Sequence, residues 1–350
     1  MLHRPISRLA IAAAAAGTVC VLGAASAGAA ATPAGSWSGP KGPVPNAHTN
    51  TAPALTQVFL TPSKHGTLVA WKGQFDNKIR YNVQVSGHWK GTRVVPGAIT
   101  GGNPAVGAYR DPNGHFAVLL VWKQLGGSKL FYSQGETKGT GAISWTKPVH
   151  LAGDISSSGP ALIFPAHAPF DRVIVAWKGP FNHVRYSVGT PAKRHFSWTK
   201  SDWIGSAANT RTGGAPALAE VSTGPSAGTV YTVFKGYKSG QVRYATTGDP
   251  LSFNSSHQLT WSSVSVVPGA STGAAPAASA LGSHASGPII IAYKSVHALT
   301  VHFQTLTAGV WSSSALVPGA ETATGPALLG GQLATASANS SGSIFFHIFS

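Results

Sequence analysis

One turn recurs along the chain, and it constrains the fold more than any other feature of the sequence. The phrase Val-Pro-Gly-Ala, followed by a threonine two residues later and then by Pro-Ala, starts at Val95, Val267 and Val317. Three fainter copies end in Pro-Ala-Leu, at Leu55, Leu162 and Leu218. The six Pro-Ala dipeptides are 51, 56, 56, 60 and 50 residues apart. A period of this length indicates a repeat architecture, so the repeat is interpreted before any single residue.

Each unit between two copies of the turn carries four short apolar or aromatic runs. In the unit from residue 53 to residue 104, the second run covers residues 68–73, the third covers residues 79–83, and the fourth follows Trp89. Gly, Asn, Asp and Pro separate these runs, as is typical of an antiparallel meander. From the aromatic residue of the second run to that of the third, the five complete units count 10, 10, 9, 10 and 10 residues. This constancy predicts one hairpin geometry throughout.

The last unit lacks a fourth strand, and the beginning of the chain supplies one. Trp37 and the degraded turn at Val44 form the last part of a unit whose first strands do not precede them. Closing a ring of sheets removes free edges and joins the termini, whereas a linear solenoid needs polar capping repeats. The sequence therefore predicts an all-β, six-bladed β-propeller of four-stranded antiparallel blades, with residues 37–52 closing the last blade. The predicted repeats start near residues 53, 104, 160, 216, 276 and 326.

The N-terminus has the features of a secretory signal. Arg4 and Arg8 precede an apolar run over residues 9–22, and small residues follow as a cleavage site. We expect a signal peptide over residues 1–31, a single propeller domain over residues 32–350, and a secreted, extracellular protein. The apolar run is too short for a transmembrane helix, and no later segment reaches about eighteen uninterrupted apolar residues, so no transmembrane anchor is expected.

Composition excludes several kinds of chemistry. The only cysteine, Cys20, lies within the predicted signal, so the mature chain would have no disulfide, no catalytic thiolate and no cysteine-based zinc site. The histidines show no spacing typical of metal ligands, and no phosphate-binding glycine loop or nucleophile elbow is present. The sequence therefore predicts neither a cofactor nor a metal.

The charge balance favours acidic partners. The formal charge is +16, and subtracting the signal-peptide residues Arg4 and Arg8 leaves +14. Such a charge attracts the chain to anionic surfaces, so glycans or anionic cell-surface polymers are the expected partners. The cations form no run of five or more, so an equally simple interpretation is that they are solvated. No nucleic acid is expected, because the chain has no basic helix or stripe. The oligomeric state stays open.

Cations and aromatic residues recur at fixed positions of the units, and they are the candidate ligand-binding residues. Recurrence would place the cations in rings, which could bind carboxylate, sulfate or phosphate groups on several blades or donate hydrogen bonds to sugar hydroxyls. Alternatively, each lysine is a solvated turn residue, and each arginine extends over an apolar face. The candidates are Trp71, Lys72, Arg80, Trp122, Lys123, Trp177, Lys178, Arg185, Lys235, Arg243 and Lys294.

One tryptophan starts the fourth strand in each of the six units. A large flat side chain between blades favours core packing, and a platform for stacking sugar rings is the alternative. The six are Trp37, Trp89, Trp145, Trp198, Trp261 and Trp311.

The acidic residues bear on whether the protein is a glycoside hydrolase. Such enzymes normally use two carboxylates. The chain has nine acidic residues, and none recurs in register with the repeat. We therefore assign no catalytic residue, and Asp76 and Glu136 are among the candidates if a carboxylate pair exists.

The repeated phrase resembles that of known propellers. A strand starting with Trp, then Val-Pro-Gly, Thr, Pro-Ala-Leu, an apolar strand ending in Trp-Lys-Gly, and a hairpin into Arg-Tyr are similar to the repeats of bacterial propeller lectins of the Photorhabdus lectin type. The chain also resembles the broader sialidase-like propeller group, although the Ser-x-Asp-x-Gly-x-x-Trp box of sialidases is absent. Related fungal fucose lectins use Arg with Glu and an aromatic residue between blades, and a recurring Glu is missing here.

The resemblance implies a secreted, non-enzymatic, lectin-like propeller with multivalent shallow carbohydrate-binding sites between blades. Two alternatives stay open. One is a sialidase-like propeller glycoside hydrolase, and the other is a cell-envelope adhesion or structural protein that binds anionic polymers by charge.

Overall fold

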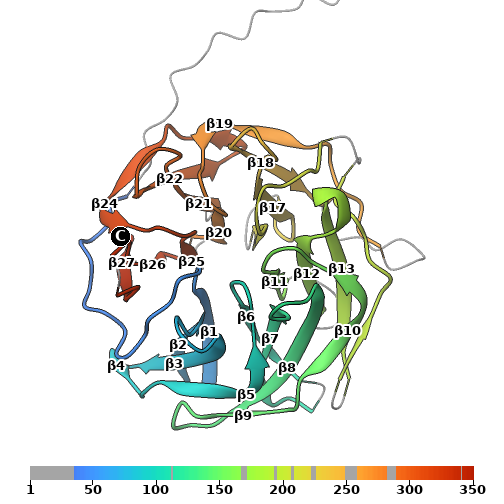
Figure 1. Ribbon diagram of the computed structural model, residues 1–350, viewed down its shortest axis with the longest axis vertical. Coiled ribbons are helices and arrows are strands. Elements are labelled where there is room, and N and C mark those ends of the chain that lie inside the picture. Colours follow the sequence, from blue (N-terminus) through green and yellow to red (C-terminus); the bar gives the residue numbers. More distant parts are fainter. Residues whose placement is uncertain are drawn as a thin grey trace, which may run out of the picture. The chain divides into compact units, whose positions relative to one another are not determined.

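Six antiparallel sheets form a ring, which makes the chain an all-β, six-bladed β-propeller (Figure 1). The computed structural model describes residues 35–350, except 112, 167–171, 193–194, 206–208, 222–225, 249–257, 282–288 and 340. The predicted signal peptide lies outside the described residues. The predicted fold class is confirmed.

Within each blade the chain runs from an innermost first strand to an outer strand that is often broken in two. Blade I contains β1 (Ala54–Thr61), β2 (Lys64–Lys72), β3 (Lys78–Val85), β4 (His88–Trp89) and β5 (Arg93–Ile99). Blade II contains β6 (Ala105–Arg110), β7 (Phe116–Lys123), β8 (Lys129–Thr137), β9 (Ile143–Trp145) and β10 (Val149–Ile155). Blade III contains β11 (Ala161–Ile163), β12 (Val173–Lys178), β13 (Val184–Pro191), β14 (Phe196–Trp198) and β15 (Asp202–Trp203), and the short 3-10 helix η1 (Pro180–Asn182) precedes β13.

The remaining three blades follow the same plan. Blade IV contains β16 (Ala217–Glu220), β17 (Val230–Lys235), β18 (Gln241–Thr246) and β19 (Ser265–Ser271). Blade V contains β20 (Ala277–Ala280), β21 (Ile289–Lys294), β22 (Thr300–Thr307), β23 (Val310–Trp311) and β24 (Ala315–Glu321). Blade VI contains β25 (Ala327–Leu329), β26 (Gln332–Ala336) and β27 (Ile344–Ile348).

The N-terminal segment supplies the missing outer strand of blade VI. Trp37 forms an antiparallel bridge with Phe349, and Lys41 forms one with Phe346. The backbone amide of Lys41 donates to the carbonyl of Phe346 at 2.7 Å, and that of Val44 donates to Ile344 at 2.9 Å. The predicted closure is confirmed: the two ends of the chain are joined by the hydrogen bonds of one sheet.

Apolar side chains fill the spaces between blades. The second strands are nearly continuous apolar runs, as in β12, because neighbouring blades cover both of their faces. Six buried clusters result, each shared by two adjacent blades. The tryptophan of each outer strand packs against the third-strand aromatic of the preceding blade, with ring centroids 5.5 to 5.7 Å apart. The pairs are Phe346–Trp89, Tyr81–Trp145, Tyr132–Trp198, Tyr186–Trp261, Tyr244–Trp311 and Phe303–Trp37. This packing supports the core interpretation of the tryptophans.

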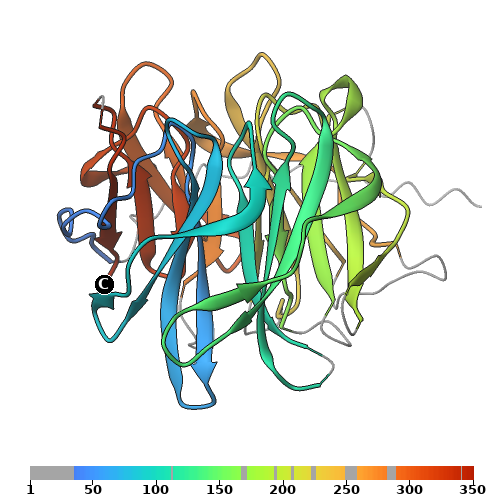
Figure 2. The ribbon, with the colours of Figure 1, turned by 60° about the horizontal axis from the view of Figure 1, so that its bottom comes forward.

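The recurrent turn joins each blade to the next and is tied to a hairpin loop. A buried Thr or Ser of the turn donates its backbone amide to the last residues of the loop between the second and third strands, at 2.7 to 3.0 Å. The pairs are Thr49–Gly342, Thr100–Asn77, Ser156–Ser128, Thr212–Asn182, Thr272–Gly240 and Thr322–Leu299. We call the end of the blades with these turns and loops the joint face, and the other end the opposite face (Figure 2).

Candidate functional site

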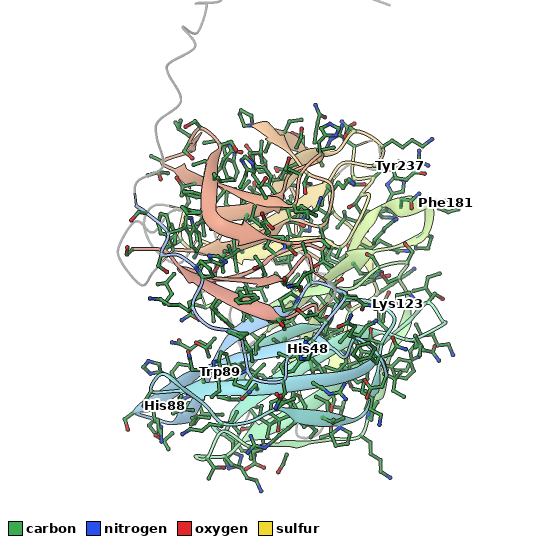
Figure 3. The ribbon with its side chains drawn as sticks, turned by 60° about the vertical axis from the view of Figure 1, so that its left-hand side comes forward. His48, His88, Trp89, Lys123, Phe181 and Tyr237 are labelled. Atoms are coloured by element: carbon green, nitrogen blue, oxygen red, sulfur yellow. The ribbon has the colours of Figure 1, made fainter. Side chains whose placement is uncertain are left out.

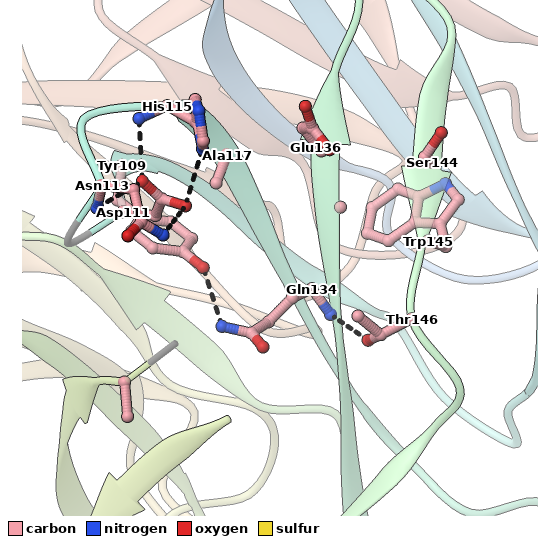
Figure 4. Close-up of a pocket in the computed structure, with 12 residues that line it drawn as sticks. Tyr109, Asp111, Asn113, His115, Ala117, Gln134, Glu136, Ser144, Trp145 and Thr146 are labelled. Carbon is pink, nitrogen blue, oxygen red and sulfur yellow. Dashed lines mark hydrogen bonds and ion pairs between the residues drawn. The ribbon is translucent and has the colours of Figure 1, made fainter. Parts of the chain in front are cut away.

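A pocket of about 380 Å³ opens at the opposite-face end of blade II (Figure 4). Its walls come from three neighbouring pieces of the blade: the loop after β6, the end of β8, and β9. Ala192, after β13 of blade III, also lines it. The pocket therefore lies where blade II meets its neighbour, above the apolar clusters and open to solvent.

Tyr109 forms the floor on the side of blade III. Its ring stacks on Phe164 with centroids 4.7 Å apart and an interplanar angle of 11°. The Nε2 of Gln134 donates to its hydroxyl at 2.9 Å. Burial raises the pKa of Tyr109 to about 12, more than the hydrogen bond from Gln134 lowers it, and the charge of Asp111 adds to the rise. The phenol therefore keeps its proton at neutral pH and can donate it to a ligand.

Asp111 holds the loop that forms one rim. Its carboxylate accepts the backbone amides of Asn113 at 2.9 Å and of His115 at 2.8 Å, and Nδ1 of His115 lies 3.3 Å away. Burial alone would raise the pKa of Asp111, but these hydrogen bonds together lower it. The group is an ionised loop anchor whose acceptor positions are largely taken.

Glu136 and its neighbours offer free polar groups on the other rim. Glu136 is exposed and pairs across the sheet with Ser144 of β9. No hydrogen bond to its carboxylate is formed by the described residues around it, so its oxygens are open to a ligand. Thr146 is fixed, because its hydroxyl accepts the backbone amide of Gln134 at 3.0 Å.

Trp145 lines the pocket, and its indole packs on the side of the sheet that faces blade I. Its indole lies against the backbone of Gly135, where an added Cβ would come 2.9 Å from the Cε3 of Trp145 and would also clash with Ile143. On its other side the ring meets Tyr81 of blade I edge to face at 5.7 Å. A glycine on β8 is thus required for the indole to pack against this strand.

The pocket chemistry differs from that of the chain as a whole. It contains two carboxylates, two carboxamides, an imidazole, a phenol and hydroxyls, and no Lys or Arg among its lining residues. Such a set accepts and donates hydrogen bonds to hydroxyl groups, and it favours a neutral or cationic ligand over an acidic one. In the parts of the chain that the structure describes, no three His, Asp or Glu side chains gather as metal ligands would.

The sequence-predicted aromatic residues lie elsewhere, inside the blades. Trp71 and Trp177 are fully buried and Trp122 is 2% exposed. Each sits at the joint-face end of a second strand, where the neighbouring blade covers its ring. None of the three presents an indole face to solvent in this structure.

The predicted lysines lie on the joint face, and most are bound to nearby carbonyl groups. Lys72 is 5% exposed, and its Nζ donates to Oδ1 of Asn50 at 2.7 Å. The Nζ atoms of Lys123, Lys235 and Lys294 donate to backbone carbonyls of Gln124, Gly273 and Ser295 at 3.1 to 3.3 Å. Burial lowers the pKa of Lys72 and of Lys178. These side chains share one face, but they do not contribute to the blade II pocket.

The predicted arginines differ from one another. Arg80 makes a bidentate ion pair with Asp76 at 2.6 and 2.7 Å, and this hydrogen bonding lowers the pKa of Asp76 to about 2. Arg243 donates to Oε1 of Gln241 at 3.3 Å. Recurrence in sequence therefore does not give these arginines a common environment.

Arg185 lies in the wedge between blades II and III on the joint face. Its guanidinium lies 5.2 Å from the ring centre of Trp203 and donates to the carbonyl of Ser201 at 3.1 Å. Asp154, 4% exposed, is close by. Burial raises its pKa to about 6, against the opposing effects of a hydrogen bond with Ser201 and of the Arg185 charge. This wedge combines a cation, a carboxylate and an aromatic ring.

The carboxylates considered for a hydrolase are separated. Asp76 lies in the joint-face loop between β2 and β3, and its carboxylate is held by Arg80. Glu136 lies near the opposite-face end of β8 in the next blade. The two cannot flank one glycosidic bond, because they belong to different faces of the ring.

Glu136 was named from the sequence only as a possible hydrolase carboxylate and Trp145 only as one of six recurring tryptophans. Gln134 was missed, because the pocket residues of β8 depart from the repeat. Gln134 and Glu136 occupy the positions of Val83 and Val85 in blade I. Their side chains share one face of β8, since alternate residues of a strand point the same way. A search for polar interruptions of the repeat would have found them, whereas a search for recurring residues could not.

Comparison with known proteins supports the fold. No family model matches the sequence, and no curated protein matches it. Among solved structures, AofleA from Arthrobotrys oligospora aligns with a TM-score of 0.56 and 13% identity over 88% of this chain and 81% of its own. The SapL1 lectin in complex with alpha methyl fucoside aligns with a TM-score of 0.50 and 14% identity over 82% of this chain and 89% of its own. At these identities the similarity shows a common propeller fold.

Proposed function

We propose that the protein is an exported, lectin-like carbohydrate-binding propeller. The observation that carries the proposal is the blade II pocket, where Glu136, Ser144 and the Tyr109 hydroxyl offer donors and acceptors beside the aromatic ring of Tyr109. Hydroxyl-rich rings bind where directed hydrogen bonds lie next to an aromatic surface. That SapL1, a propeller of similar fold, is a lectin seen with a fucoside supports this assignment.

The pocket favours a saccharide without acidic groups. Its two acidic side chains, Asp111 and Glu136, are carboxylates, and a sugar carboxylate or sulfate would be repelled by Glu136. Asp111 is tied to its loop and has a lowered pKa, so it is not suited to act as the proton donor of a glycosidase. The arrangement therefore serves binding.

The wedge around Arg185 is a second candidate site of the same function. Its guanidinium, the ring of Trp203 and the buried carboxylate of Asp154 lie together between two blades. With the pocket, this makes the proposed lectin bivalent, and an acidic or neutral sugar suits this second site because Arg185 supplies a positive charge.

A glycan array with matched variants tests the proposal. Wild type should bind neutral or amino sugars at both low and high salt, since hydrogen bonds in a pocket are screened little. Tyr109→Phe keeps the ring and removes one donor, so affinity should fall about tenfold. Glu136→Gln should lower it similarly, whereas Glu321→Gln, an exposed glutamate of β24 on the joint face, should leave it unchanged. Absence of any bound glycan, or equal loss with Glu321→Gln, would contradict the proposal.

A further inference from the structure

The joint face carries a set of exposed apolar side chains at its hairpin tips. In each of blades I to V, the loop after the second strand presents one apolar or aromatic residue. Phe75 is 87% exposed, Phe181 76%, Leu125 44% and Val296 40%, and the half-buried Tyr237 lies in the same loop of blade IV. Isolated exposed apolar residues are common, but an apolar or aromatic residue in the same loop of five successive blades is a patterned surface.

These tips are held in position. Each loop is bound to the neighbouring turn through the backbone hydrogen bonds described above, as between Thr212 and Asn182 at 2.7 Å. Phe181 has a φ of 56°, in the left-handed region, which a bulky residue adopts only at an energetic cost. Figure 3 shows Lys123, Phe181 and Tyr237 along one side of the molecule. The apolar tips therefore form a fixed set on the joint face, one from each of five successive blades.

Lysines surround the same tips. The five loops and the residues that flank them contain a single acid, Asp76, which Arg80 already neutralises. Arg211 and Lys238 both lie 5.6 Å from the ring centre of Tyr237. Lys72 is buried and bound to Asn50, and the other lysines of these segments are Lys78, Lys123, Lys129, Lys178, Lys235, Lys238 and Lys294. The apolar tips are thus set within a cationic collar.

The opposite face lacks this pattern among the described residues. Its turns at Ser63, Gly87 and Gly331 are polar or glycine-rich. The exposed apolar residues there are scattered and include Val310, at 62% exposure, Ile348, at 43%, and Phe59, which stacks on Phe116 at 5.3 Å. The two ends of the ring therefore differ in exposed apolar residues because their hairpin loops have different sequences, and the shared blade repeat does not cause this difference.

We propose that the joint face docks on an anionic lipid bilayer surface, with the hairpin tips in the headgroup region and the lysines against the lipid phosphates. Amphipathic surfaces of this kind bind peripherally by apolar insertion together with electrostatic attraction. Charge complementarity selects the partner, because the collar is cationic. Next to Leu125, a crevice of about 340 Å³ lined by Ile99, Trp122 and Phe131 extends the apolar area.

This mode of binding differs from membrane spanning. Within the described residues, no helix is long and apolar enough to cross a bilayer. It is also independent of the blade II pocket, which opens at the opposite end of that blade, whereas the Arg185 wedge lies on the joint face and would be covered. Docking through the joint face leaves that pocket directed away from the lipid.

Vesicle sedimentation with synthetic lipids tests the inference without any glycan present. Wild type should bind vesicles of phosphatidylcholine mixed with phosphatidylglycerol, and should bind phosphatidylcholine alone much more weakly. Phe75→Ser combined with Phe181→Asn should weaken binding by about tenfold or more, because both rings leave the headgroup region. Asn tolerates the left-handed backbone at position 181, so folding is preserved.

Matched variants of the opposite face serve as controls. Val310→Ser should bind the anionic vesicles as wild type does. The opposite-face double variant Lys64→Glu with Lys138→Glu should bind them more strongly than the joint-face double variant Lys129→Glu with Lys238→Glu. The proposal is overturned by absence of binding to the anionic vesicles. It is also overturned by full binding of the double phenylalanine variant, which would indicate bare electrostatics. Light scattering provides a further check: a wild-type dimer that Phe75→Ser with Phe181→Asn converts to monomer would assign the tips to a second copy of the chain instead.

Discussion

The hydroxyl of Tyr186 in blade III donates to the carbonyl of Leu259 in blade IV at 3.1 Å and accepts the amide of the same residue at 2.9 Å. Leu259 precedes Trp261, whose indole packs on the Tyr186 ring. Tyr81 makes the same pair of bonds with Ile143 of blade II, two residues before Trp145. One tyrosine thus locks the next blade twice, through its ring and through its hydroxyl.

Tyr186→Phe should therefore destabilise the fold although the ring is kept. It leaves a buried amide and a buried carbonyl without their partner, which costs about 1 to 3 kcal/mol in the free energy of unfolding. Urea denaturation measures the change. Tyr237→Phe removes the hydroxyl of a half-buried tyrosine at a hairpin tip, for which no side-chain hydrogen bond is formed by the described residues, and serves as the control, with an expected change below about 0.5 kcal/mol. Equal effects of the two variants would show that the inter-blade bonds contribute nothing.

Trp37→Ala should weaken the closure of the ring. The indole contacts Phe303 of blade V at 5.7 Å and Phe349 at 5.1 Å, and it is 7% exposed. Truncating a buried tryptophan costs about 3 to 5 kcal/mol. The midpoint of thermal unfolding should fall accordingly. Trp203→Ala, which removes a half-buried tryptophan of one outer strand, should cost less, and an unchanged midpoint for Trp37→Ala would refute its role in closure.

Asp154 gives the wedge a defined pH dependence. Burial raises its pKa to about 6 from an ordinary value of 3.8, so the folded state binds a proton more tightly than the unfolded state does. Stability is therefore lost as the pH rises from about 4 to 6, and the full cost, about 3 kcal/mol, is present above that range. Asp154→Asn should be more stable than wild type at pH 7, with the difference shrinking toward pH 4. Urea titrations across this range measure it, and a constant difference would contradict the assignment.

Gly135→Ala should disturb the packing between blades I and II next to the blade II pocket. The new methyl group would meet Ile143 and the indole of Trp145, so the ring must shift or the strands must part. Overpacking of this kind costs about 1 to 3 kcal/mol, and tryptophan fluorescence should change with it. Gly39→Ala is the control, because a Cβ added there would have no atom within 4 Å and the backbone is outside the left-handed region. Unaltered stability of Gly135→Ala would mean that the indole can move freely.

The repeat in the sequence was sufficient to predict the fold, because blade geometry depends on features that every unit must share. The turn before Pro104, the buried Thr100 and the aromatic Tyr81 each make a packing contact that is needed in all six blades. The segment at Trp37 was informative for the same reason, since only a closed ring accounts for a fourth strand that lacks the other three strands of its blade.

The same argument from recurring residues could not predict the blade II pocket. Recurrence drew attention to Trp71 and Trp177, which recur because every blade interior needs a large apolar ring, and the structure buries both. The pocket instead depends on Gln134 and Glu136, which break the pattern in one blade. Whether such a break lies beside a cavity depends on the neighbouring blade, so only the folded arrangement reveals it.

The pairing of the first and last strands also governs the order in which the molecule can form. Ser36 and Ser350 exchange backbone hydrogen bonds at 2.9 Å in both directions, so blade VI is complete only when both ends of the chain are present. Contacts that span nearly the whole chain form slowly, because a long loop must close before they contribute. A chain that has begun to emerge from synthesis therefore cannot close its ring early. Because Ser36 and Ser350 lie side by side, a circularly permuted chain could join them and begin and end at Ser63. Such a chain would preserve every strand pairing.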